Sequence, residues 1–273
     1  MSSRKALLGA IACLALARPV GAAEPLRLDY SVTWGSVEIG RIEVTTLQRE
    51  GRYLLESRAR TLGILAFFAP LQSVSTAEGL TGEDGRAVPS VFSVTSRWRD
   101  EERQLALGLD PNGQILSDER SEPPPDSEYV PEPVPTALQQ GPDPLSLLLT
   151  ATRHALPDKV LRGRSYDGRR VIDSTLACGG VEPSSITPVA VGLGPIFVCT
   201  LSAELVAGGR RGGSSRRMVE GPARVWLARG FGDGGAWPVR LELDTRLGQV
   251  VALPIPSAAR AGLTAPGEHT PPG

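Results

Sequence analysis

The residue types that most often carry out catalysis are scarce in this sequence. Histidine occurs only as His154 and His269, and neither stands in a pattern such as HExxH. The motifs CxxC and GxSxG and the phosphate-binding loop are also missing. Lys159 is the one lysine after residue 23, so a lysine nucleophile is a poor candidate. We therefore expect no catalytic residues, no metal ligands and no cofactor.

Two cysteines could form a covalent link. Cys178 and Cys199 lie beyond the N-terminal segment, and an even number of cysteines in an oxidising compartment favours a disulfide. Its loop of about 20 residues would add roughly 3 kcal/mol to stability in the chain-entropy model. The alternative is two buried free thiols. We predict the disulfide Cys178–Cys199.

Two apolar segments are candidates for binding a ligand. The run Thr61–Ala69 interrupts the strand pattern with large apolar side chains and reads as a short helix or a hydrophobic lid. The segment Asp143–Ala155 reads as a helix, with Asp143 at the N-cap and Pro144 at the first helical position. The apolar residues of Thr61–Ala69 could instead serve plain core packing. The predicted ligand-binding residues are Leu62, Leu65, Phe67, Phe68, Leu145 and Leu149.

The N-terminal segment has the layout of a secretion signal. Arg4 and Lys5 precede an uncharged run from Ala6 to Ala17, and small residues lead up to Ala23. The run is too short to cross a bilayer core, which takes about 20 helical residues. We expect cleavage after Ala23 and a periplasmic protein. The alternative is a lipid anchor on Cys13.

Length and charge limit the remaining possibilities. Residues 24–255 are long enough for a single β domain. Loss of residues 1–23 removes three basic residues and no acidic one, which turns 29 basic against 30 acidic residues into 26 against 30. That weakly negative balance argues against nucleic acid as a partner. No run in residues 24–273 approaches transmembrane length.

Alternation of apolar and polar residues predicts a mostly β protein. Leu26–Trp34 is typical, because its apolar residues recur at every second position. We predict a curved antiparallel sheet forming an open or half barrel, with one or two short helices at its concave side. A disordered, acidic and proline-rich loop is expected at 118–135, and a disordered tail at 256–273. The predicted strands are 26–34, 37–44, 53–59, 71–80, 88–98, 101–109, 114–117, 164–176 with a turn at Tyr166–Arg169, 195–206, 218–229, 236–245 and 248–254.

Several short motifs, taken in their order, resemble those of an uncharacterised family of exported bacterial proteins, domain of unknown function 3108. The resemblance covers about Leu26 to Leu253 and implies no established activity or catalytic residue. The implied shape is similar to the open β-barrels of periplasmic lipoprotein carriers, a fold-level analogy. The motifs are LRLDYSVTWGSVEIG near the N-terminus, DPLS at Asp143, YDGRR at Tyr166, IFVCTLSAE around Cys199 and the strand pair from Ala236 to Leu253.

Three functions remain open at this stage. The first is a periplasmic protein that binds or carries an apolar, lipid-like or envelope-derived ligand inside the curved sheet. The second is a non-catalytic structural or interaction protein of the cell envelope. The third is a carboxylate-based hydrolase, which needs two acidic residues converging in a cleft.

Overall fold

One continuous antiparallel sheet makes up most of the protein. The computed structural model describes residues 24–121, 132–182, 193–194, 196–209, 221–231, 233–246 and 248–255. Within these residues thirteen strands lie in the order β7-β6-β5-β4-β3-β2-β1-β13-β12-β11-β10-β9-β8. The elements are β1 (Leu26–Trp34), β2 (Val37–Arg49), β3 (Arg52–Thr61), α1 (Gly63–Phe68), β4 (Leu71–Thr81), β5 (Ala87–Trp98), β6 (Glu101–Leu109), β7 (Ile115–Arg120), a 3-10 turn (Thr136–Leu138), α2 (Pro144–His154), β8 (Val160–Tyr166), β9 (Arg170–Glu182), β10 (Ile196–Gly208), β11 (Ala223–Ala228), β12 (Trp237–Thr245) and β13 (Gly248–Pro254).

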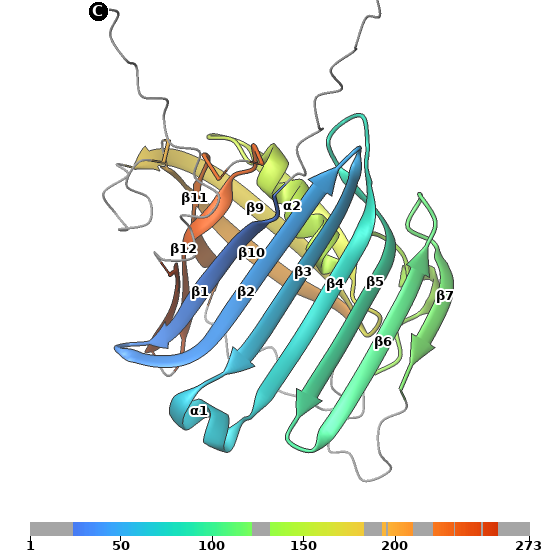
Figure 1. Cartoon of the computed structure of the whole chain (residues 1–273), viewed down its shortest axis with the longest axis horizontal. Coiled ribbons are helices and arrows are strands. Elements are labelled where there is room, and N and C mark those ends of the chain that lie inside the picture. Colours follow the sequence, from blue (N-terminus) through green and yellow to red (C-terminus); the bar gives the residue numbers. More distant parts are fainter. Residues whose placement is uncertain are drawn as a thin grey trace, which may run out of the picture.

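The predicted fold class is confirmed. The sheet curls around α2 but stays open, with β7 and β8 as its two edge strands and no ladder joining them in the described part of the chain (Figure 1). β1 joins the two halves of the sheet, β2–β7 and β8–β13, because it pairs with β2 on one side and with β13 on the other. The first and last strands of the chain therefore lie side by side in the middle of the sheet, and α2 packs on its concave face.

Some strands extend beyond their predicted bounds, because polar residues at their ends also pair with the neighbouring strand. The loop expected from residue 118 begins later, because β7 continues to Arg120 and Asp118 pairs with Leu107 of β6. β8 begins at Val160, ahead of the predicted strand, and pairs with β9 across the turn at 167–169. Most of the acidic loop, the predicted signal segment 1–23 and the tail 256–273 lie outside the described residues.

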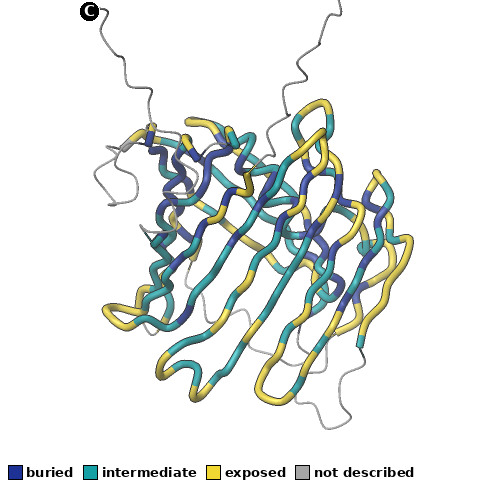
Figure 2. The backbone as a smooth tube through the Cα atoms, viewed as in Figure 1, coloured by how far each residue is buried: buried dark blue, intermediate teal, exposed yellow. Residues whose placement is uncertain are grey.

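The hydrophobic core covers both faces of the sheet at β10. Along β10, Ile196 and Val198 join the main apolar cluster, whereas Phe197 and Cys199 join a second one. This is the period-2 geometry of a strand that is covered on both faces. Buried positions gather where the strands pass α2, and the hairpins at the opposite rim are exposed (Figure 2). No described helix is long and apolar enough to cross a membrane.

Candidate ligand-binding cavity

A cavity of about 340 Å³ lies on the concave side of the sheet. It is bounded by the inner face of β4, β5 and β6, by the first turn of α2, and by the turn between β8 and β9. Its lining mixes apolar, hydroxyl and charged side chains: Ser73, Ser75, Phe92, Val94, Ser96, Arg103, Leu105, Pro144, Leu145, Asp167, Arg169 and Arg170.

The sheet wall of the cavity changes from apolar to polar along the strands. The row nearest α2 is apolar, with Ala77 opposite Phe92, which is itself opposite Leu107. The next inward-facing row is Ser75, Val94 and Leu105, and the third is Ser73, Ser96 and Arg103. Because side chains on one face recur at every second residue, these rows form one continuous surface. The sheet wall of the cavity therefore runs from Phe92, through a row that mixes Ser75 with Val94 and Leu105, to a polar row.

A buried polar chain anchors the first turn of α2. The Asp143 carboxylate caps the helix, with Oδ1 accepting from the backbone N–H groups of Leu145 and Ser146, both at 2.9 Å. The Ser146 hydroxyl donates to Asp143 Oδ2 at 2.5 Å and lies 2.7 Å from the Tyr53 hydroxyl on β3. This chain locks the helix onto the sheet, so Leu145 is held against the cavity.

Burial dominates the electrostatics of that chain. Desolvation raises the pKa of the Asp143 carboxyl, against the opposing effect of its hydrogen bonds from Ser146 and Leu145. Desolvation also raises the pKa of Tyr53. A nucleophilic serine needs an adjacent base, and the partners of Ser146 here are a capping carboxylate and a phenol. The arrangement is a structural cap.

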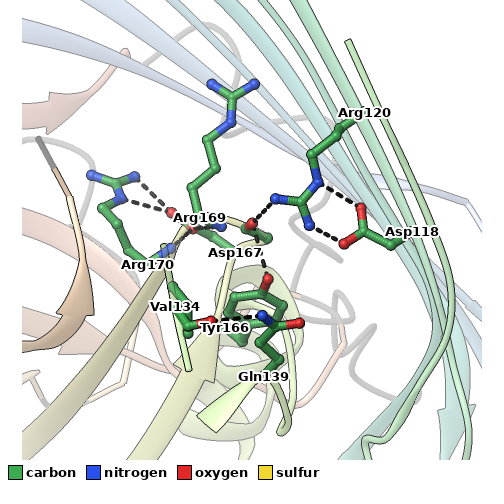
Figure 3. A network of polar contacts seen from close by, with 9 residues as sticks. Asp118, Arg120, Val134, Gln139, Tyr166, Asp167, Arg169 and Arg170 are labelled. Atoms are coloured by element: carbon green, nitrogen blue, oxygen red, sulfur yellow. Dashed lines mark hydrogen bonds and ion pairs between the residues drawn. The ribbon is translucent and has the colours of Figure 1, made fainter. Parts of the chain in front are cut away.

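The turn between β8 and β9 forms the wall opposite the sheet (Figure 3). Asp167 Oδ1 accepts from the backbone N–H groups of Arg169 at 2.9 Å and of Arg170 at 2.7 Å. Asp167 Oδ2 also pairs with the Arg170 guanidinium at 2.7 Å. One carboxylate therefore holds the turn in shape and fixes one of its two arginines.

The same turn joins the two edges of the open sheet. The Gly168 carbonyl accepts from the Tyr166 hydroxyl and from Nη1 of Arg120, each at 3.0 Å, and Arg120 belongs to edge strand β7 (Figure 3). Asp118 pairs with Arg120 and orients its guanidinium. Side chains thus bridge the seam between β7 and the β8–β9 turn beside the cavity.

Charges in the lining are mainly positive. The lining contains three arginines, Arg103, Arg169 and Arg170, and one carboxylate, Asp167. Arg103 is held by Glu101 through an ion pair of 2.6 Å. Sequence reasoning missed all three arginines as site residues, although the YDGRR turn containing two of them was recognised as a motif.

The predicted ligand-binding residues separate into three locations. Leu145 lines the cavity, and Leu149 is fully buried in the main core beneath α2. Leu62, Leu65, Phe67 and Phe68 belong to α1 or its N-cap, at the connection from β3 to β4, and none lines the cavity. No residue of α1 is buried, and Phe67 is 80% exposed. The structure therefore does not bring the two predicted segments together.

The cysteines and the helical histidine lie away from the cavity lining. Cys178 and Cys199 are directly opposite on β9 and β10 and form the predicted disulfide. His154 ends α2, about 15 Å along the helix from the cavity at a rise of about 1.5 Å per residue. Within the described residues no group of three or more histidine, cysteine, aspartate or glutamate side chains could hold a metal ion.

Comparison with known families settles the relationship of the chain. The family model described as "Protein of unknown function (DUF3108)" matches residues 29–253. The chain belongs to the DUF3108 family. The match spans the sheet from β1 to β13, including α2 and the cavity, so the site is part of the DUF3108 domain.

One solved structure gives a distant likeness to this DUF3108 protein. It is the beta-barrel-like protein of domain of unknown function DUF1849 from Brucella abortus, at 10% sequence identity and a TM-score of 0.45. The alignment covers 85% of this chain and 96% of that one. No curated protein matches the sequence.

Proposed function

We propose that this protein is an exported periplasmic protein that binds or carries a lipid-like ligand in the cavity on its concave face. The observation that carries the proposal is the lining itself. Phe92, Val94, Leu105 and Leu145 form an apolar wall with polar groups converging at one end. Small-molecule sites typically combine an apolar concave surface with a few placed polar groups.

Export is supported by two independent features. The charged n-region at Arg4–Lys5 and the uncharged run Ala6–Ala17 have the layout of a secretion signal. The Cys178–Cys199 disulfide is the kind of bond that persists in oxidising compartments such as the periplasm.

A second candidate function rests on α1. Ile64, Phe67 and Phe68 are all more than half exposed on this short helix. Exposed apolar groups of this kind occur at interaction sites. An envelope interaction protein would use this rim, without a ligand in the cavity. The hydrolase alternative finds little support, because the cavity lining contains one carboxylate, Asp167, where paired acids are required.

The test is native mass spectrometry of protein isolated from the periplasm without detergent, followed by solvent extraction. We expect a polypeptide mass that begins at residue 24 and a bound mass in the lipid range. A chain that begins at Cys13 and carries acyl groups would identify a lipid anchor instead. A ligand-free protein would overturn the carrier function and favour the interaction protein.

A matched pair of variants ties the bound mass to the cavity. Val94 lines the cavity, whereas Val91 lies on the outer face of the same strand and is 45% exposed. Val94→Trp fills the cavity and should abolish co-purification, and Val91→Trp should leave it unchanged. Loss of the bound mass in both variants, or in neither, would place the ligand elsewhere.

A further inference from the structure

The polar end of the cavity is built from arginines that are distant in the sequence. Arg103 comes from β6, and Arg169 and Arg170 come from the β8–β9 turn. The curl of the sheet brings these two regions to opposite walls of one cavity. Three guanidinium groups in a lining with one carboxylate favour an anion over a cation there, in addition to the carboxylates that already pair with them.

Neighbouring carboxylates hold the side chains of Arg103 and Arg170 and the backbone of Arg169. Glu101 pairs with Arg103, whose side chain is only 12% exposed. Asp167 fixes the backbone of the turn and pairs with Arg170. A guanidinium has five N–H donors, so it can keep one carboxylate partner and still donate to a second anion. Groups that are ordered before binding lose little entropy when a ligand arrives.

Hydroxyl and apolar groups continue the site from the arginines inward. Ser73 and Ser96 share a row with Arg103, and the neighbouring row contains Val94 and Leu105. The serines can donate hydrogen bonds to a charged headgroup, whereas Val94 and Leu105, which share their row with Ser75, offer apolar contact to a chain. Along the sheet wall, a row of charge and hydroxyl groups is therefore followed by a row that is mainly apolar.

We infer that the ligand is an amphiphile with one anionic headgroup, a carboxylate or a phosphate monoester, and a single alkyl chain. The headgroup lies among Arg103, Arg169 and Arg170, and the chain lies along the apolar wall. The volume of about 340 Å³ is near the lower end of the roughly 300–1,000 Å³ found for ligand pockets, which favours one chain over two. This inference rests on the proposed function and specifies its ligand.

Probes with the same chain and different headgroups test the inference by calorimetry on the delipidated protein. We expect dodecanoate and dodecyl phosphate to bind at least about tenfold more tightly than dodecyltrimethylammonium, because a hydrogen bond to a charged group contributes about 1.5–3 kcal/mol. Inorganic phosphate alone should bind much more weakly than dodecyl phosphate, because it leaves the apolar wall empty.

Arginine variants assign the selectivity to the cavity. Arg169→Gln and Arg103→Gln should each weaken binding of both anionic probes about tenfold and leave dodecyltrimethylammonium unchanged. Arg162→Gln is the matched control, because Arg162 is exposed on β8 and does not line the cavity. Arg169 lies in a turn outside the strands, so its variant decides the question if Arg103→Gln fails to fold.

Three outcomes would overturn the inference, and they separate it from the proposed function. Equal affinity for anionic and cationic dodecyl probes, with no effect of Arg169→Gln, would exclude an anion-selective site while leaving lipid binding intact. Inorganic phosphate binding as tightly as dodecyl phosphate would indicate a site for free anions. Failure of every dodecyl probe to bind would overturn the proposed function itself.

Discussion

Asp143 shows how one residue serves both the local structure and the tertiary packing. Its carboxylate caps α2, and through the Ser146 hydroxyl it connects the helix to Tyr53 in the middle of the sheet. The N-cap role was predictable from the Asp-Pro pair alone. The connection to Tyr53, 93 positions away from Ser146, was not, because it depends on how the sheet curls around the helix.

Two substitutions of Asp143 should show how much the helix cap contributes to the free energy of unfolding. Asp143→Ala should lower the free energy of unfolding by about 2–4 kcal/mol, because it removes the cap and leaves buried donors without an acceptor. Asp143→Asn should cost about 1 kcal/mol or less, since its amide oxygen can accept the same backbone hydrogen bonds. Urea unfolding measures both, and equal losses would exclude the capping role.

The pH dependence of the same residue has a defined sign. Burial raises the pKa of Asp143 above its ordinary value of 3.8, so the folded state keeps its proton to higher pH than the unfolded state does. Its contribution to stability is fully present below pH 3.8 and is lost as the pH rises through the folded-state pKa. The unfolding free energy of the wild type minus that of Asp143→Asn should therefore fall across that window. A difference that stays constant with pH would contradict the raised pKa.

At the scale of elements, the two helices have opposite surroundings. α2 lies inside the curve of the sheet and contacts β3, β4, β5 and β8 (Figure 1). α1 joins β3 to β4 at the rim and contacts mainly β2. Both segments are rich in large apolar residues, so composition alone made them look alike. Only α2 covers its apolar residues, because only α2 lies between strands from the two halves of the curled sheet, β3–β5 on one side and β8 on the other.

Truncation of one apolar residue in each helix should show the contrast. Leu149→Ala should lower the free energy of unfolding by about 2–5 kcal/mol, since Leu149 is fully buried. Phe67→Ala should change it by less than about 0.5 kcal/mol, because Phe67 is mostly exposed. Chemical denaturation measures both. Comparable losses would mean that α1 is covered in the folded protein.

At the scale of the whole molecule, the sheet has an open seam between its edge strands β7 and β8. β7 and β8 do not pair, and the β8–β9 turn bridges them through the hydrogen bond from Arg120 to Gly168. Gly168 has a φ of +85°, and a Cβ added there would lie 2.3 Å from a methyl group of Leu105 on β6. Only glycine allows the turn to approach the opposite wall this closely.

Substitution at this seam should cost more than at an ordinary turn. Gly168→Ala combines left-handed backbone strain of about 1–2 kcal/mol with overpacking against Leu105 of about 1–3 kcal/mol. Gly35→Ala is the matched control, since its φ is +58° and nothing lies within 4 Å of the added Cβ. Thermal or urea unfolding should show a larger loss for Gly168→Ala, and equal losses would mean that the two walls are not in close contact.

The sequence by itself determined the local features of this protein. Alternation along β1 and its neighbours predicted strands, the Asp143-Pro144 pair predicted the start of α2, and the even cysteine count predicted the Cys178–Cys199 disulfide. Each of these predictions depends on residues close together in the chain or on a count of cysteines, so it did not require the curvature of the sheet.

Only the tertiary structure decided where the site lies. Arg103 and Arg169 line the same cavity because the open sheet curls until β6 faces the β8–β9 turn. The exposure of Phe67 and the burial of Leu149 were decided in the same way. The physical reason is that a period of two specifies which face of a strand is apolar, whereas the curvature of the whole sheet decides which distant residues share that face.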